Sequence, residues 1–280
     1  QRANKMLIIA RTTPKDQVKK PTEGLSLFYT DFDRKHIEVR EIDKMGRHAV
    51  DSNMLFFDGF EIPEEDRIGP EGAGFRQILH GMNPERMLIA AEAVGIGHAA
   101  LARASTYAKE RVVFGRPIGK FQVIRHKFAE MATKAEAAKQ FTYSTAWRFG
   151  NGEYPVREIT MAKLFASRIA CEVADECVQI LGGYGYMKEY EIERAYRDVR
   201  LNRIGAGTDE IMLDVSRDIC QLFEADRMTI YTTSEDGASI VSKVKTGLNS
   251  FKDLKLPIAE HSIAGYVALA KKTINIKDCY

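Results

Sequence analysis

Residues 111–122, Arg-Val-Val-Phe-Gly-Arg-Pro-Ile-Gly-Lys-Phe-Gln, form a basic loop, broken by glycine, between two long stretches of helical pattern. The two glycines let the backbone approach a ligand closely, and Pro117 stiffens the turn. The first amides of the following helix carry partial positive charge beside Arg111 and Arg116, which favours an anion such as a phosphate-bearing cofactor. The alternative is an ordinary helix–helix connection with a solvated arginine, and the loop by itself leaves both interpretations open.

Apolar residues recur at helical spacing on both sides of this loop. They predict one helix over about 74–113, a second over 123–149 and a third over about 156–181, which a Gly-Gly pair ends. A fourth helix is predicted to begin near Thr208. Four apolar-striped helices with short connections predict an up-and-down four-helix bundle.

Alternating or continuous apolar runs precede the helices and are separated by turn-rich segments. They predict an antiparallel sheet with strands at 6–12, 25–30, 37–42 and 54–62. Beyond the helices, two further runs alternate like strands around a Glu-Asp-Gly turn signal, at 227–232 and 238–244. The predicted fold class is therefore mainly α, with antiparallel β-strands before the bundle and a partial α+β segment after it.

Composition narrows the class of protein. A chain of 280 residues that is 45% hydrophobic can bury a large core and hold about two domains. The formal net charge of +2 gives no reason to expect a nucleic-acid partner. No apolar run approaches the ~20 residues of a membrane span and no signal segment opens the chain, so we expect a soluble, cytoplasmic protein. The four cysteines have no C-x-x-C spacing and the six histidines form no metal-like pair, so no metal site is predicted.

Four motifs resemble the acyl-CoA dehydrogenase family, in the family's own order. The loop at 111–122 resembles its R-x-x-F-G-x-x-I-x-x-F-Q signature, and Asn-Pro-Glu-Arg at 83–86 resembles a D-x-x-R element on its central helix. Gln-Ile-Leu-Gly-Gly-Tyr-Gly at 179–185 and Gly-Ala-Gly-Thr-Asp-Glu-Ile at 205–211 match two further motifs. Residues 1–222 as a whole resemble the C-terminal part of the family.

The resemblance divides the chain into three parts. Residues 1–72 correspond to the later strands of a middle β-domain, and 73–222 to the C-terminal four-helix bundle domain. Residues 223–280 resemble the first half of a GAF domain, through the Ile-Ala-Gly-Tyr element at 263–266. The family's N-terminal helical domain and earlier strands have no counterpart here. We therefore expect a fragment, and activity of these residues alone is not implied.

The family chemistry that the resemblance implies is the FAD-dependent α,β-dehydrogenation of an acyl-CoA thioester to the trans-2-enoyl-CoA. A carboxylate removes the α-proton while the β-hydrogen leaves as hydride to the flavin. Many members carry this base immediately before Gly-Thr, where this sequence has Ala206. A smaller branch, including isovaleryl-CoA and long-chain acyl-CoA dehydrogenases, carries it on the central helix at the position of Glu85. We hypothesise that Glu85 is the catalytic base.

Glu85 and Arg86 can also be interpreted as residues with a purely structural role. Asn83 can act as the N-cap of a helix with Pro84 at its first position, and Glu85 then only complements the helix dipole. Arg86 resembles the family arginine that lies near the CoA moiety, although Asn83 stands where the family has Asp. The alternative for Arg86 is a first-turn salt bridge with Glu85 or Glu92.

The remaining site residues are carried over from the family motifs. Ala206 and Gly207, with Asn83 and Arg86, are the predicted substrate-binding residues. The predicted cofactor-binding residues fall into three sets: Arg111, Phe114 and Gln122, which contact FAD across the subunit interface in the family; Gln179, Gly182 and Gly183, which meet its adenosine-diphosphate part; and Thr208 and Glu210, which follow the Gly-Thr turn. Gly182 and Gly183 also have a plain alternative as a helix C-cap.

The resemblance also implies partners. Members of the family are homodimers or homotetramers that act in fatty acid metabolism and pass electrons to an electron-transferring flavoprotein. A competing hypothesis from another class is a non-catalytic helical oligomerisation module with a truncated GAF-type sensor tail. The missing N-terminal half favours that alternative, because the flavin ring and the acyl chain also rest on it in the family.

Overall fold

The computed structural model describes residues 3–216, 228–233, 239–246 and 255–257. The chain divides into two compact units, Gln1–Ser216 and Arg217–Tyr280. The predicted three-part division at residues 72 and 222 stays a prediction.

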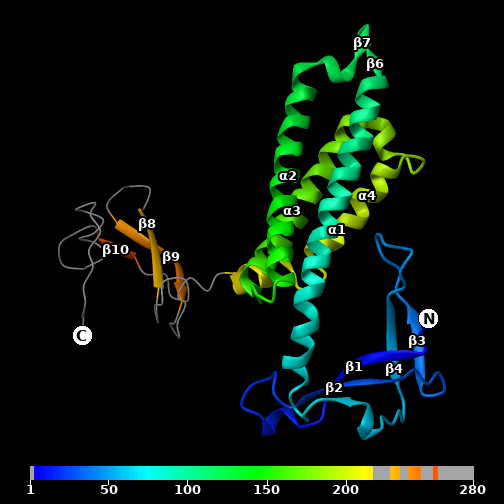
Figure 1. Cartoon of the computed structure of the whole chain (residues 1–280), viewed down its shortest axis with the longest axis vertical. Coiled ribbons are helices and arrows are strands. Elements are labelled where there is room, and N and C mark those ends of the chain that lie inside the picture. The colour runs from blue at the N-terminus through cyan, green and yellow to red at the C-terminus, as the bar shows by residue number, and fades with distance from the viewer. Residues whose placement is uncertain (1–2, 217–227, 234–238, 247–254, 258–280) are drawn as a thin grey trace. The chain divides into compact units, whose positions relative to one another are not determined.

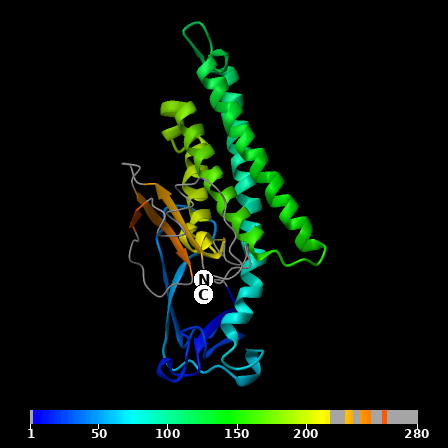
Figure 2. The same ribbon diagram turned by 90° about the vertical axis from the view of Figure 1, so that its left-hand side faces the viewer.

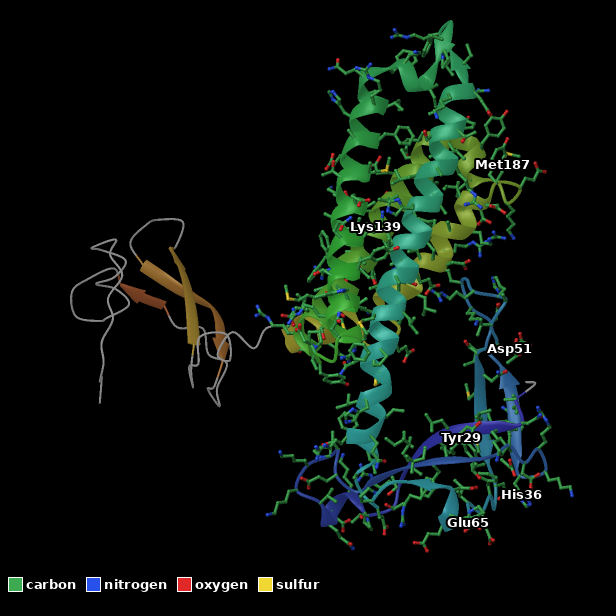
Figure 3. The ribbon with its side chains drawn as sticks, viewed as in Figure 1. Tyr29, His36, Asp51, Glu65, Lys139 and Met187 are labelled. Carbon is green, nitrogen blue, oxygen red and sulfur yellow. The ribbon has the colours of Figure 1, made fainter. Side chains whose placement is uncertain are left out.

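The N-terminal strands form two small antiparallel sheets (Figure 1). One sheet has the order β1-β2-β5, and the other pairs β3 with β4. The strand bounds are β1 Lys5–Arg11, β2 Leu25–Asp31, β3 Ile37–Glu41, β4 Asn53–Phe57 and β5 Arg67–Ile68. Strand β2 supplies most of the buried side chains of this region, while Tyr29 on it and Glu65 nearby are exposed (Figure 3).

The first three predicted strands are confirmed, but the fourth was predicted too long. It ends at Phe57 instead of continuing to Ile62. The reason is the following turn, where Asp58 donates its amide to the His36 carbonyl at 3.0 Å and Gly59 has a φ of 58°. A left-handed residue ends the extended backbone at that point. The two-residue strand β5 carries too little pattern to be predicted.

Three long helices, α1 Gly74–Glu110, α2 Gln122–Gly150 and α3 Val156–Leu181, confirm three of the predicted helices and lie side by side (Figures 1 and 2). α1 and α3 face each other through small residues, of which Ala90, Ala93, Ala100, Ala104, Ala162, Ala166, Ala170 and Ala174 are buried. Small side chains let two helix axes approach closely. The start of α1 is equally close to the sheet: a Cβ on Gly74 would lie 2.5 Å from the backbone nitrogen of Leu27.

The bundle differs from the predicted four helices by one element. A short helix, α4 Glu191–Val199, lies between α3 and the helix that begins at Asp209, α5 Asp209–Ser216. α4 has nine residues and buries only Ile192 and Val199, so its apolar pattern is too short to stand out. Short 3₁₀ segments at Gly182–Tyr186 and Arg200–Arg203 flank it.

α1 also corrects the proposed helix cap at Asn83. α1 already begins at Gly74, so Asn83 and Pro84 lie inside it, and the N-cap alternative for this segment is wrong. Proline inside a helix removes one backbone hydrogen bond, which the remaining turns of a 37-residue helix tolerate. At its other end α1 stops at Glu110 and not at Val113, because β6 Val112–Val113 pairs with β7 Arg116–Pro117.

α1 is also the one helix in the described part of the chain whose length and composition suffice to cross a membrane. One such helix is weak evidence for a membrane span. Core helices of bundles pass the same test, and α1 packs its alanine face against α3.

In the second unit, β8 Met228–Thr233 pairs antiparallel with β9 Ser239–Thr246, and β10 Lys255–Pro257 pairs with β9. The two strands predicted here are confirmed. The turn at 235–237 and the GAF-like element at 263–266 lie outside the described residues.

Candidate active site

The predicted substrate residues meet where α1 passes the turn that precedes α5. Arg86 is buried, and its Nε donates to the carbonyl oxygen of Ala206 at 3.1 Å. Its Nη1 donates to Oδ1 of Asn83 at 3.0 Å, and Nδ2 of Asn83 donates to the Tyr154 hydroxyl at 3.0 Å. Burial lowers the pKa of the Arg86 guanidinium, and the neighbouring Glu85 carboxylate opposes this effect. Arg86 thus connects α1 to the turn.

The salt-bridge alternative for Arg86 does not describe the structure. Glu92 pairs instead with Arg47, at 2.7 Å. Arg47 also donates its amide to Oδ1 of Asp198 at 2.6 Å and a guanidinium nitrogen to Oδ1 of Asn202. A basic residue of the β3–β4 connection therefore anchors that connection to the bundle close to the same turn.

The turn itself has two residues in the left-handed region, Ala206 with a φ of 52° and Gly207 with a φ of 111°. Arg86 holds the first carbonyl, and Lys163 of α3 holds the second: its Nζ donates to the Gly207 oxygen at 2.6 Å. Lys163 has no exposed surface. Burial lowers its pKa, the Asp209 carboxylate works in the opposite direction, and Arg86 adds to the lowering. Two buried cations therefore bind two successive backbone carbonyls.

Asp209, the first residue of α5, completes the cluster. Its Oδ2 accepts from Nε of Arg168 at 2.9 Å and from Nε of Arg203 at 2.8 Å. Burial alone would raise the pKa of this carboxyl, but the two guanidinium hydrogen bonds outweigh burial and lower it. Just before it, Oγ1 of Thr208 accepts the amide of Ile211 at 3.5 Å, as an N-cap does.

Glu85 occupies the turn of α1 beside this cluster and is exposed, next to buried Arg86. One helical turn further along, Ile89 Cδ1 lies 3.9 Å from where a Cβ on Gly205 would be. The structure therefore brings Asn83 and Arg86 together with the turn at 205–208, and it places exposed Glu85 on the same turn of α1. Glu210 is exposed on α5, where its own amide and Thr208 lower the pKa of its carboxyl.

Sequence reasoning missed several residues of this cluster: Tyr154, Lys163, Arg168, Arg203 and Asp209. One signal was available. Lys163, Ser167 and Cys171 recur along α3 at intervals of four residues, which places all three on one face of the helix.

The second group of predicted residues lies at the other end of α1. Phe114 and Gly115, with φ of 52° and 77°, form a tight hairpin turn, and Phe114 is 90% exposed. The Arg116 guanidinium lies 4.2 Å from the centre of the Phe121 ring, and that of Arg111 lies 5.5 Å from the centre of the Tyr184 ring. Gln122, the first residue of α2, is exposed.

A pocket of about 490 Å³ connects two of the predicted cofactor sets, since Arg111, Gly182, Gly183 and Tyr184 all line it. Gly182 is the C-cap of α3 with a φ of 60°, so the capping interpretation of this glycine is correct as well. Met187, labelled in Figure 3, lines the same pocket. Gln179 is exposed on the last turn of α3 and does not line it.

The two groups are far apart. Arg86 and Arg111 are separated by 25 residues of α1, or about 37 Å at 1.5 Å per residue. Figure 1 shows the β6–β7 hairpin at the end of α1 opposite the β-sheets. The chain therefore carries two separate candidate sites, the turn site around Arg86 and Ala206 and the hairpin site around Arg111 and Gly182.

Comparison with known proteins bears directly on both sites. The profile described as acyl-CoA dehydrogenase, C-terminal domain, matches residues 72–219, which contain all four motifs. The chain belongs to the acyl-CoA dehydrogenase family. It is similar to the probable acyl-CoA dehydrogenase YdiO of Escherichia coli, with 36% identity over 211 residues that cover 75% of this chain and 54% of that protein.

Two further relatives carry more specific names. The CarC subunit of the caffeyl-CoA reductase-Etf complex of Acetobacterium woodii is 37% identical over 198 residues, which cover 70% of this chain and 52% of that subunit. The structure of butyryl-CoA dehydrogenase from Megasphaera elsdenii superimposes with a TM-score of 0.74 and 35% identity, over 78% of this chain and 56% of that one. The chain spans about half the length of the curated relatives it matches. The comparisons give no support to the GAF-like resemblance of residues 223–280.

Proposed function

We propose that this chain is the C-terminal part of an FAD-dependent enzyme that dehydrogenates an acyl-CoA thioester to its trans-2-enoyl-CoA, with Glu85 as the base. One observation carries the proposal. The segment of α1 that carries Glu85 is hydrogen-bonded, through Arg86, to Ala206, which stands at the sequence position where most of the family carries the base. The carboxylate of Glu85 on α1 thus takes the role that a carboxylate at the position of Ala206 has in most of the family.

Glu85 acts on the α-proton of the thioester. Its neighbour on α1, Arg86, is buried and hydrogen-bonded to the turn, which fixes the segment of the helix that carries the carboxylate. Glu85 is exposed in this chain, so the desolvation that adjusts a general base toward neutral pH must come from what binds over it. Asn83 leaves Arg86 with a neutral hydrogen-bond partner where the family has a carboxylate.

The residues of the hairpin site fit the adenosine-diphosphate part of FAD. Arg111 supplies a cation for the phosphates. A Cβ on Gly182 or on Gly183 would have no neighbour within 4 Å, so the backbone there is open to a ligand. Thr208 and Glu210, at the turn site, match the family's other cofactor contacts. When bound, FAD supplies the acceptor for the hydride.

The distance between the two sites supports an oligomer. About 37 Å along α1 is too far for one FAD molecule to contact both Arg111 and the turn before α5. We therefore propose that a second copy contributes its hairpin site to the flavin held at the turn site, in a homodimer or homotetramer. Similarity to a subunit of a reductase-Etf complex supports an electron-transferring flavoprotein as redox partner. Action in fatty acid metabolism and a cytoplasmic location belong to the same proposal.

The test begins with the purified chain incubated with FAD and desalted, followed by anaerobic addition of octanoyl-CoA. We expect the retained flavin to lose its visible absorbance. Glu85→Gln should retain flavin and abolish bleaching, a loss of at least about 10²-fold in rate, because general-base catalysis contributes about 10²–10⁴-fold.

The matched control is Glu110→Gln, which removes an exposed carboxylate at the far end of the same helix. It should bleach at the rate of the unchanged chain. Bleaching by Glu85→Gln at that same rate contradicts the assignment of the base, whereas no retained flavin in the unchanged chain contradicts its competence to bind FAD alone.

A further inference from the structure

Three side chains on one face of α3 bind the segment that leads to the turn. Cys171 Sγ contacts the Val199 carbonyl oxygen at 3.6 Å, Ser167 Oγ donates to that of Asn202 at 3.0 Å, and Lys163 Nζ donates to that of Gly207 at 2.6 Å. Because the three residues are spaced by four, they follow one another along the helix face. The segment 199–207 is thus attached to α3 at three carbonyls, those of Val199, Asn202 and Gly207, and Lys163 makes the attachment within the turn itself.

Of the three side chains, Lys163 is the one whose burial costs the most free energy. It is completely buried, in a stretch of α3 whose other buried residues include Ala162, Ala166 and Ser167. A buried ammonium group is costly unless it is hydrogen-bonded and paired. Its hydrogen bond goes to Gly207, and the carboxylate of Asp209 acts on it with the opposite charge, so both of its compensating partners belong to the turn and the start of α5.

The two cations of the turn site also fix where the backbone amides point. All peptide bonds of the described chain are trans, so each N–H points opposite to the carbonyl of the same peptide group. Arg86 holds the Ala206 carbonyl and Lys163 holds the Gly207 carbonyl. The amides of the next residues, Gly207 and Thr208, are therefore turned away from the buried cations.

We propose that Lys163 is a positioning residue of the active site: by binding the Gly207 carbonyl it holds the turn at 206–208 in its left-handed conformation, with the amides of Gly207 and Thr208 turned away from the two cations. This inference rests on the proposed function, because it gives the turn a role in binding the thioester and the cofactor. The hydrogen bond from Lys163 also explains how the turn keeps the strained backbone conformation of Ala206. Ala206 in the left-handed region costs on the order of 1 kcal/mol or more, which persists only where the surroundings determine the conformation.

The direct test observes the turn without using activity. Met212 is fully buried, and its Cε would lie 2.6 Å from a Cβ on Gly207, so its methyl group reports on the position of the turn. In the chain labelled with ¹³C-methyl methionine, Lys163→Leu should shift the Met212 methyl resonance. The methyl resonance of Met131, which is buried on α2, should stay in place.

The matched control is Lys134→Leu. Lys134 pairs with Glu130 and Glu172 across the outer surfaces of α2 and α3, so the same substitution there removes a lysine that does not contact the turn. It should leave the Met212 resonance unchanged. A merely structural role for Lys163 predicts a lower melting temperature with the Met212 methyl unmoved.

The functional arm uses flavin bleaching by octanoyl-CoA. Lys163→Leu should lower the limiting rate about ten- to hundredfold with a much smaller change in the octanoyl-CoA concentration that gives half that rate, since small misplacements cost up to about 10²-fold. An unmoved Met212 methyl with an unchanged limiting rate in the folded variant overturns the proposal. If Lys163→Leu does not fold, Lys163→Gln, whose shorter side chain retains donors, decides by the same two measurements. If the unchanged chain does not bleach, these residues are not active alone, and the Met212 resonance still decides whether Lys163 holds the turn.

Discussion

The turn site and the hairpin site are built from the same kinds of residues and differ in how those residues are satisfied. At the turn site, Arg86 and Lys163 are buried and their hydrogen bonds go to carbonyls of the same chain. At the hairpin site, Arg111 and Arg116 lie over aromatic rings, and Phe114 is 90% exposed. The buried cations of the first site find their hydrogen-bond partners within one chain, whereas the second site is open to a ligand or to another copy. Substitutions at the turn site should therefore cost stability, and those at the hairpin site should cost binding.

The largest effect is expected at Asp209. Asp209→Asn keeps the shape of the side chain and removes the charge that compensates Arg168 and Arg203. Removing one partner of a buried ion pair costs about 3–5 kcal/mol, and we expect the lower end, about 3 kcal/mol, because Asp209 is buried but both arginines are partly exposed. Urea unfolding followed by the fluorescence of Trp147, the single tryptophan, measures it. Asp175→Asn, at an exposed position of α3, is the control and should stay within about 0.5 kcal/mol.

The same carboxylate gives a pH dependence whose sign is fixed. The pKa of Asp209 is lowered in the folded chain, so its contribution to stability is present above the unfolded pKa of about 3.9 and is lost as the pH falls through the folded pKa. The difference in unfolding free energy between the unchanged chain and Asp209→Asn should therefore be constant from about pH 5 to 7 and shrink below about pH 4. A difference that grows on acidification contradicts the assignment of this carboxylate as ionised in the fold.

The difference between the two sites also explains which helices and site residues could be predicted from the sequence. The three long helices were predictable because their apolar periodicity is local and because glycine or proline marks their ends. The cap at Asn83 was wrong for a related reason: Asn-Pro is a local signal for a helix start, but the periodicity of α1 runs through it. Exposed residues of the hairpin site were found through their motif.

The partners at the turn site were hidden because they are distant in the sequence. Lys163 binds a carbonyl 44 residues away, and Arg86 binds one 120 residues away. A lysine in a helical pattern is most often exposed, so its complete burial follows only from the packing of α3 against the turn. The pairing of Glu85 with Ala206 was inferred from the family resemblance and not from spacing, since 121 positions separate them.

An intermediate effect comes from one substitution made at each site. Gly207 and Gly115 both have positive φ, but a Cβ on Gly207 would lie 2.6 Å from buried Met212, whereas one on Gly115 has no neighbour within 4 Å. Gly207→Ala should cost about 2–3 kcal/mol through backbone strain plus displacement of Met212, and Gly115→Ala about 1 kcal/mol through strain alone. Urea unfolding of both variants measures the difference, and equal losses would remove the structural distinction between the two turns.

The smallest effect on stability, and the sharpest on binding, is expected at Phe114. Its ring is almost wholly exposed and contacts Phe121 edge-on at 6.5 Å, so Phe114→Ala should change the unfolding free energy by less than about 0.5 kcal/mol. If a second copy uses this hairpin to complete its flavin site, the same variant should retain less FAD after desalting and sediment as a smaller species. Tyr143→Ala, at an exposed aromatic residue on α2, serves as the control for flavin retention. If the Phe114→Ala chain keeps its flavin and its size, the exposed Phe114 ring is not by itself a contact to flavin or to a second copy. Flavin binding at the hairpin site would then depend on Arg111 and the glycines at 182 and 183.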